Sequence, residues 1–188
     1  MSRNDVRPRV VLVGAMGAGK TTVAELLAAQ WGLSVRDTDR DVEAAQGRAI
    51  SDIFVDDGEE VFREFERAAV ADALRSHDGV LALGGGAVLD PATRETLKSH
   101  RVVFLNVGLS DAVKRVGLGS ARPLLLGNVR ARIKALLDER MPIYREVAGA
   151  TVDTDGKAAE DVAREVRETV ENAEAAASGD PAWTTQHE

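Results

Sequence analysis

The chain has 188 residues, of which 44% are hydrophobic and 29% charged, contains no cysteine, and carries a formal net charge of −7 at pH 7. The lack of cysteine excludes disulfides and thiolate metal sites and predicts a cytoplasmic protein, because the cytoplasm is reducing. The negative charge argues against a nucleic-acid-binding protein, and no apolar run approaches the roughly 20 residues of a membrane span, so we expect neither partner.

Apolar runs alternate along the chain with segments of helical periodicity. This alternation indicates βαβ units and therefore a three-layer α/β fold, in which a parallel sheet is covered by helices on both faces. We expect one domain over residues 1–188, with a core at about 9–172, a lid-like loop at about 117–127 and a disordered tail at about 178–188. The predicted strands are 9–14, 33–39, 79–83, 101–107 and 150–154, and the predicted helices are 21–32, 51–74 with a break at Gly58, 90–99, 129–148 and 158–177.

The segment GAMGAGKT at 14–21 matches the phosphate-binding pattern G-x-x-x-x-G-K-[ST] in full, between a predicted strand and a predicted helix. In such a P-loop the backbone N–H groups converge on phosphate oxygens, and the helix N-terminus adds positive potential. Lys20 is expected to reach the β- and γ-phosphates, and the Thr21 hydroxyl to bind Mg²⁺. The predicted phosphate-binding residues are Gly14, Ala15, Met16, Gly17, Ala18, Gly19, Lys20, Thr21 and Thr22.

A P-loop does not identify the acceptor, because kinases, GTPase switches and ATP-driven machines all contain one. The chain lacks the N-K-x-D pattern that reads guanine, and it is small for a motor. These two observations favour a kinase that phosphorylates a small molecule.

Asp37, Asp39 and Asp41 alternate near the end of a predicted strand. An EF-hand is excluded, because Val42 replaces its glycine and Arg48 its closing glutamate. Two interpretations remain open. The acids cap the following helix, or they face a ligand crevice, where Asp37 holds a water on Mg²⁺ and Asp39 takes an acceptor hydroxyl.

Three consecutive glycines, Gly84, Gly85 and Gly86, follow an apolar run although glycine costs backbone entropy. They form a tight turn, or they bring bare backbone N–H groups close to a ligand. Phe62 and Arg63 lie on a predicted helix, where pattern alone favours an inward aromatic ring and an outward arginine.

The combined set of segments, in this order, resembles the shikimate kinases: GAMGAGKTT, DTD, GRAISDIFVDDGEEVFREFE, LALGGGAV, RPLL and DERMPIYREVA. The resemblance extends from about residue 10 to 155. It implies ATP-dependent phosphorylation of the 3-hydroxyl of shikimate, on the pathway to aromatic amino acids, with Mg²⁺ as cofactor. It also implies a nucleoside-monophosphate-kinase-like fold with a five-stranded parallel sheet, a helical acceptor-binding region and a lid.

The same resemblance implies roles for individual residues. Asp39 would hold the acceptor's hydroxyls, Arg63 and Arg140 its carboxylate, and Phe62 would form a wall against its ring. Arg122 would come from the lid and act catalytically together with Lys20 and Asp39.

The remaining implied contacts concern the glycines and the adenine. Gly84, Gly85 and Gly86 would present N–H groups to the acceptor's oxygens, and Arg115 would stack on adenine. Because one chain supplies a complete site, we expect a monomer. The alternatives are another small-molecule P-loop kinase, such as a gluconate kinase, and a nucleotide-dependent regulator that has lost its chemistry.

Overall fold

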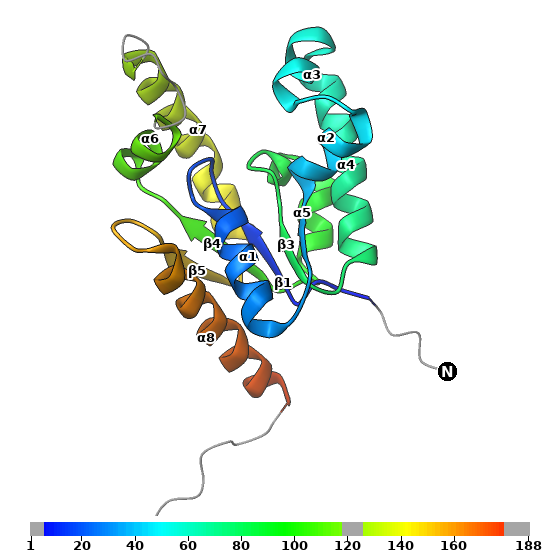
Figure 1. The fold of residues 1–188 in the computed structure, drawn as a ribbon, viewed down its shortest axis with the longest axis vertical. Helices are drawn as coiled ribbons and strands as arrows, with labels where there is room; N and C mark the ends of the chain where they lie inside the picture. Colours follow the sequence, from blue (N-terminus) through cyan, green and yellow to red (C-terminus); the bar gives the residue numbers. More distant parts are fainter. Residues whose placement is uncertain (1–5, 118–125, 179–188) are drawn as a thin grey trace, which may run out of the picture.

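The structure is a computed structural model that describes residues 6–117 and 126–178. A five-stranded sheet with the order β2-β3-β1-β4-β5 forms its centre, and all four strand pairs are parallel. The α/β class and the five-stranded parallel sheet are therefore confirmed (Figure 1). The strands are β1 (Val10–Val13), β2 (Val35–Asp37), β3 (Val80–Ala82), β4 (Val102–Asn106) and β5 (Ala150–Asp153).

Helices lie on both faces of this sheet. Helix α1 packs against α8 on one side, and α4, α5 and α7 lie on the other (Figure 1). No helix within residues 6–117 and 126–178 is long and apolar enough to cross a membrane. The helices are α1 (Lys20–Trp31), α2 (Thr38–Gln46), α3 (Ile50–Asp56), α4 (Gly58–Ser76), the 3-10 helix η1 (Ala87–Leu89), α5 (Pro91–Leu97), α6 (Leu109–Gly117), α7 (Leu126–Val147) and α8 (Ala159–Ser178).

Strand β1 is apolar throughout because it occupies the middle of the sheet. Leu12 pairs with Ala82 on one side and with Val103 on the other, and its side chain is fully buried. A parallel strand that is covered on both faces has no solvent side, so alternation of polar residues is not expected in it. This explains the uninterrupted VVLV sequence of β1.

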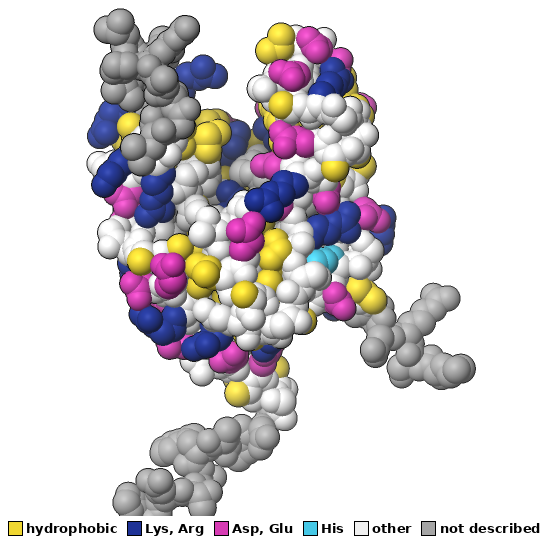
Figure 2. All heavy atoms as spheres, in the orientation of Figure 1, with side chains coloured by type: hydrophobic (Ala, Val, Ile, Leu, Met, Phe, Trp, Pro, Cys, Tyr) yellow, Lys and Arg dark blue, Asp and Glu magenta, His cyan; other side chains and the backbone are white. Residues whose placement is uncertain are grey.

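A second, smaller apolar cluster lies apart from the main core. Val42 of α2, Ile53 of α3 and Phe62 of α4 are buried together, and Ile50 and Phe65 pack against them. These helices form one arm of the molecule, and α6 with the start of α7 forms the opposite arm (Figure 1). The space-filling view shows the molecule hollowed between the two arms (Figure 2).

The structure corrects the predicted strand at 33–39. Strand β2 ends at Asp37, whose carboxylate accepts hydrogen bonds from the backbone N–H groups of Asp39 and Arg40 and so caps α2. Asp39 therefore lies in the first turn of a helix. Of the predicted loop at 117–127, Gly117 ends α6 and Leu126 begins α7, while residues 118–125 lie outside the described residues. The predicted tail also lies outside them, except Ser178, which ends α8.

We expect Gly79→Ala to lower the free energy of unfolding by about 1–3 kcal/mol. A Cβ at Gly79 would overlap the Ser34 carbonyl oxygen and would lie 2.9 Å from His77 Nε2. Gly149→Ala is the matched control, because its Cβ would meet only the Val102 carbonyl oxygen at 3.8 Å. Urea unfolding measures both variants, and equal midpoints would contradict the tight β2–β3 approach.

Candidate active site

A cleft of about 660 Å³ opens between the two arms, where β1, β2 and β3 end. The side chains along the hollow in Figure 2 include both basic and acidic groups. Gly14, Ala18 and Gly84 are buried and do not line this cleft. Among the residues that the sequence singled out, those lining it are Ala15, Met16, Gly17, Gly19, Lys20, Thr21, Thr22, Asp39, Phe62, Arg63, Gly85, Gly86 and Arg140.

The P-loop connects β1 to the N-terminus of α1. Gly19 caps this helix with a φ of 86°, a left-handed conformation that favours glycine. The Lys20 Nζ atom lies across the loop and donates to the carbonyl oxygens of Gly14 at 2.8 Å and Ala15 at 3.1 Å. Burial lowers the pKa of Lys20, and the nearby charge of Asp39 acts in the opposite direction. The loop thus holds a cation beside the N-terminus of α1, an arrangement suited to phosphate.

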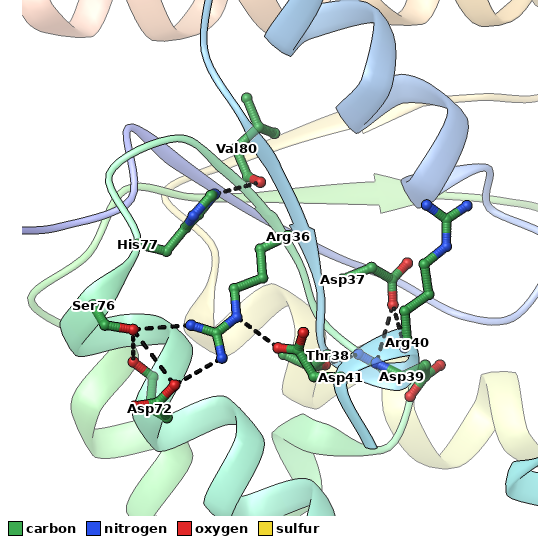
Figure 3. A network of polar contacts seen from close by, with 11 residues as sticks. Arg36, Asp37, Thr38, Asp39, Arg40, Asp41, Asp72, Ser76, His77 and Val80 are labelled. Atoms are coloured by element: carbon green, nitrogen blue, oxygen red, sulfur yellow. Dashed lines mark hydrogen bonds and ion pairs between the residues drawn. The ribbon is translucent and has the colours of Figure 1, made fainter. Parts of the chain in front are cut away.

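Thr21 and Asp37 bring two oxygen donors together beside the P-loop. The Thr21 hydroxyl donates to Asp37 Oδ2 at 2.7 Å. Asp37 Oδ1 accepts from the N–H groups of Asp39 and Arg40 (Figure 3). The capping interpretation is therefore confirmed for Asp37. No group of three or more His, Asp or Glu side chains forms a metal cage within the described residues. Two hard oxygen donors next to a phosphate loop fit Mg²⁺, which keeps several waters and binds phosphate oxygens.

Asp39 faces the cleft from the first turn of α2. Burial raises the pKa of its carboxyl group from 3.8 to about 6, and the charge of Asp37 adds to this shift, whereas Lys20 opposes it. The group is therefore ionised at neutral pH but close to its titration range. Such a carboxylate can accept a hydrogen bond from a hydroxyl group and hold its proton.

Two of the three glycines, Gly84 and Gly86, allow charged side chains to approach the end of β3. A Cβ at Gly84 would overlap the Asp39 carboxylate, and one at Gly86 would overlap the Arg63 guanidinium. The Gly84 N–H donates to the Thr38 hydroxyl at 3.0 Å. This bond corrects the expectation that the Gly84 N–H serves an acceptor molecule, while Gly85 and Gly86 do line the cleft.

Arg63 is held by two carboxylates of its own helix. Its Nη1 atom lies 2.6 Å from Glu66 Oε2 and its Nη2 atom 3.0 Å from Glu59 Oε1. Glu66 is only 3% exposed, and burial raises its pKa although the Arg63 charge opposes the shift. Sequence reasoning missed Glu66. The signal was present, because Glu66 lies in a buried helical stripe that also contains Phe62 and Val70, where an acid needs a partner.

Arg140 reaches the cleft from α7 on the opposite side. Its Nε atom is buried and makes no hydrogen bond within the described part of the chain. Phe62 packs with Phe54, with ring centroids 4.7 Å apart, and both rings line the cleft. Phe54 is a second residue that sequence reasoning missed.

Arg115 does not line this cleft. Its guanidinium donates to the Gly17 carbonyl at 3.0 Å and to the Thr154 carbonyl at 2.8 Å, so it connects the P-loop to the residues after β5. Arg122, the predicted catalytic arginine, lies outside the described residues.

Arg36, on the edge strand β2, connects the two helices that carry Asp39 and Arg63. Its guanidinium contacts Asp41 of α2 at 2.6 Å, and Asp72 and Ser76 of α4 at 2.7 and 2.9 Å (Figure 3). This network fixes α2 against α4 outside the apolar cluster.

The family model for shikimate kinase matches residues 16–171. The shikimate kinase of Thermobifida fusca is 57% identical over 157 residues, which is 84% of this chain and 91% of that protein. Among solved structures, the shikimate kinase of Acinetobacter baumannii in complex with shikimate superposes with a TM-score of 0.82. It is 36% identical and covers 89% of this chain and 94% of its own.

A gluconokinase from Sinorhizobium meliloti also superposes, over 92% of this chain and 98% of its own. Its TM-score is 0.54 and its identity 20%, so this likeness concerns the fold alone.

We expect Asp39→Asn to raise the free energy of unfolding at pH 8 by on the order of 2 kcal/mol, because each pKa unit corresponds to about 1.4 kcal/mol. The folded-state pKa of about 6 lies above 3.8, so the folded protein binds more protons between these values and loses stability as pH rises through them. The gain should therefore disappear near pH 4. Urea unfolding across this range measures it, with exposed Glu64→Gln as control, and a pH-independent difference would contradict it.

We expect Arg36→Gln to lower the free energy of unfolding by about 1 kcal/mol, more than a typical exposed ion pair, because one guanidinium serves three partners. The matched control is Arg40→Gln, which removes a more exposed pair with Glu25. The difference between the variants should shrink in 1 M NaCl through screening. Identical urea midpoints for both variants at low salt would contradict the role of this network.

Proposed function

The chain belongs to the shikimate kinase family, and we propose that it transfers the γ-phosphoryl group of ATP to the 3-hydroxyl of shikimate. The observation that carries this proposal is the convergence of the P-loop, Asp39 and two arginines, Arg63 and Arg140, in one cleft. A phosphate-binding loop beside two guanidinium groups and a carboxylate suits an acceptor that carries both a carboxylate and hydroxyls.

The acceptor's carboxylate binds Arg63 and Arg140 in this proposal, because planar guanidinium groups hold a carboxylate through paired hydrogen bonds. Glu66 supports this arrangement, since its 2.6 Å contact fixes the orientation of Arg63. Phe62 and Phe54 form an apolar wall against the ring of the acceptor. Gly85 and Gly86 supply its remaining backbone contacts.

The donor's phosphates bind the N–H groups of the P-loop and the Lys20 ammonium. When bound, Mg²⁺ would neutralise phosphate charge, and Thr21 would be its ligand with Asp37 acting through water. Arg115 lies beside the adenine in this proposal, which its position between Gly17 and Thr154 supports. Arg122 acts on the transferring group from the lid.

Phosphoryl transfer passes through a loose transition state, so catalysis depends on alignment and charge stabilisation more than on a strong base. Asp39 accepts a hydrogen bond from the 3-hydroxyl and directs its oxygen toward the γ-phosphate. Its pKa of about 6 leaves it ionised at neutral pH and able to hold the released proton. Its main role in this proposal is orientation.

We also propose a monomeric, cytoplasmic enzyme with one kinase domain. The P-loop and the acceptor residues of α2, α4 and α7 all come from a single chain, which supports a site that needs no second subunit.

ADP release with Mg·ATP tests the function directly, with shikimate or gluconate as the acceptor. We expect stimulation by shikimate alone. ATP binding without stimulation by shikimate would contradict the acceptor assignment.

We expect Arg63→Lys to raise the KM for shikimate by roughly 10- to 100-fold, because a lysine ammonium cannot replace the paired hydrogen bonds that a planar guanidinium group makes with a carboxylate. The KM for ATP should change little. Arg67→Lys, an exposed change on the same helix, is the matched control. Equal effects of the two variants on the KM for shikimate would contradict the carboxylate-binding role.

A further inference from the structure

Tyr144 is a buried residue that lies directly behind the acceptor side of the cleft. Its side chain is 1% exposed, and its hydroxyl donates to the Gly85 carbonyl oxygen at 2.6 Å. Its ring stacks on Phe104 of β4, with centroids 5.1 Å apart and planes at 23°. One side chain of α7 thus contacts the sheet core through its ring and the glycine turn through its hydroxyl.

Arg140 is four residues before Tyr144, so the two side chains project from the same face of α7. Gly85 lies next to Arg140, since a Cβ at Gly85 would lie 3.7 Å from Arg140 Nη1. The Tyr144 hydroxyl bond therefore joins α7 to the glycine turn behind the cleft, and these two elements are the walls that the acceptor contacts in the proposed function. The length of this hydrogen bond fixes the distance between α7 and the glycine turn.

Pro142 makes the hydrogen bond between Tyr144 and Gly85 more important for the position of α7. It lies inside α7, between Arg140 and Tyr144, and a proline removes a backbone hydrogen bond from a helix interior. The helix is therefore less rigid on its own just where Arg140 projects. The fixed tyrosine supplies a constraint that the helix backbone lacks there.

We propose that Tyr144 is a positioning residue for the acceptor, whose hydroxyl fixes the glycine turn and Arg140 at the spacing that shikimate requires. The inference rests on the proposed function, because it takes shikimate as the acceptor. Tyr144 does not line the cleft, so it acts through Gly85 and Arg140 and not by touching substrate. Burial raises the pKa of its hydroxyl to about 12, so the group remains a donor throughout the physiological pH range.

Tyr144→Phe tests this role, because it keeps the ring on Phe104 and removes only the hydroxyl. We expect the KM for shikimate to rise about tenfold, because the Gly85 carbonyl loses its donor and the glycine turn is no longer held against α7, and the KM for ATP to change less than twofold. Thr169→Val is the matched control. It removes a hydroxyl bond to a backbone carbonyl, Thr169 Oγ1 to Glu165 O at 2.8 Å, from the distant helix α8.

Two outcomes would overturn the proposal. The KM for shikimate would stay within twofold of the parent, or the KM values for shikimate and ATP would rise together, as in general loosening of the site. A parent chain without shikimate-stimulated ADP release would instead overturn the proposed function, and this inference with it. The assay of the parent therefore separates the two failures.

A second measurement leaves the parent sequence intact. Tyr144 is the single tyrosine of the chain, so 3-fluorotyrosine incorporation gives one ¹⁹F resonance that reports on this residue alone. We expect shikimate to shift this resonance, because it binds the groups that the hydroxyl positions. An unchanged resonance at saturating shikimate would overturn the proposal.

Discussion

The charged side chains of Asp39 and Arg63 can both reach the end of β3 only because glycines occupy the positions that they approach. The Asp39 carboxylate lies against Gly84 and the Arg63 guanidinium against Gly86, each in space that a single methyl group would fill. Glu66, buried beneath them, pairs with Arg63 at 2.6 Å. The geometry of the acceptor side therefore depends on a close approach between backbone and charge, and Tyr144 holds the same turn from the other side.

This arrangement lowers the stability of the folded protein and in return prepares it for binding. Burial raises the pKa values of both Asp39 and Glu66, which means that each carboxylate would be better solvated in water. Neighbouring cations offset part of that cost, Lys20 for Asp39 and Arg63 for Glu66. Groups that are desolvated and oriented before a ligand arrives need little reorganisation during phosphoryl transfer, which is how preorganised sites gain rate.

The parts of the molecule that sequence reasoning predicted are those encoded by local patterns. The P-loop was predicted because its glycines and its lysine follow one another along the backbone, and β1 because a strand covered on both faces is apolar throughout. Helix α2 was not among the predicted helices, and its first residues were assigned to a strand. Asp37 both ends β2 and caps α2, and the hydrogen bonds that mark the start of the helix are not visible in the sequence.

Phe54, Arg36 and Tyr144 were missed for a different reason. Their roles depend on partners that are distant in sequence or on another helix, as when Tyr144 reaches Gly85 across 59 positions. No sequence periodicity indicates such a contact. Glu66 is different, because an acid inside an apolar helical stripe stands out once α4 is analysed as an amphipathic helix.

The separate apolar cluster of Val42, Ile53 and Phe62 has an evolutionary consequence. Substitutions among these three residues act mainly on the packing of α2, α3 and α4 against one another, because the cluster lies apart from the main core. Acceptor preference can then diverge by repacking three helices while the nucleotide machinery stays fixed. A fold divided in this way is well suited to giving rise to kinases for different small molecules from one ancestral scaffold.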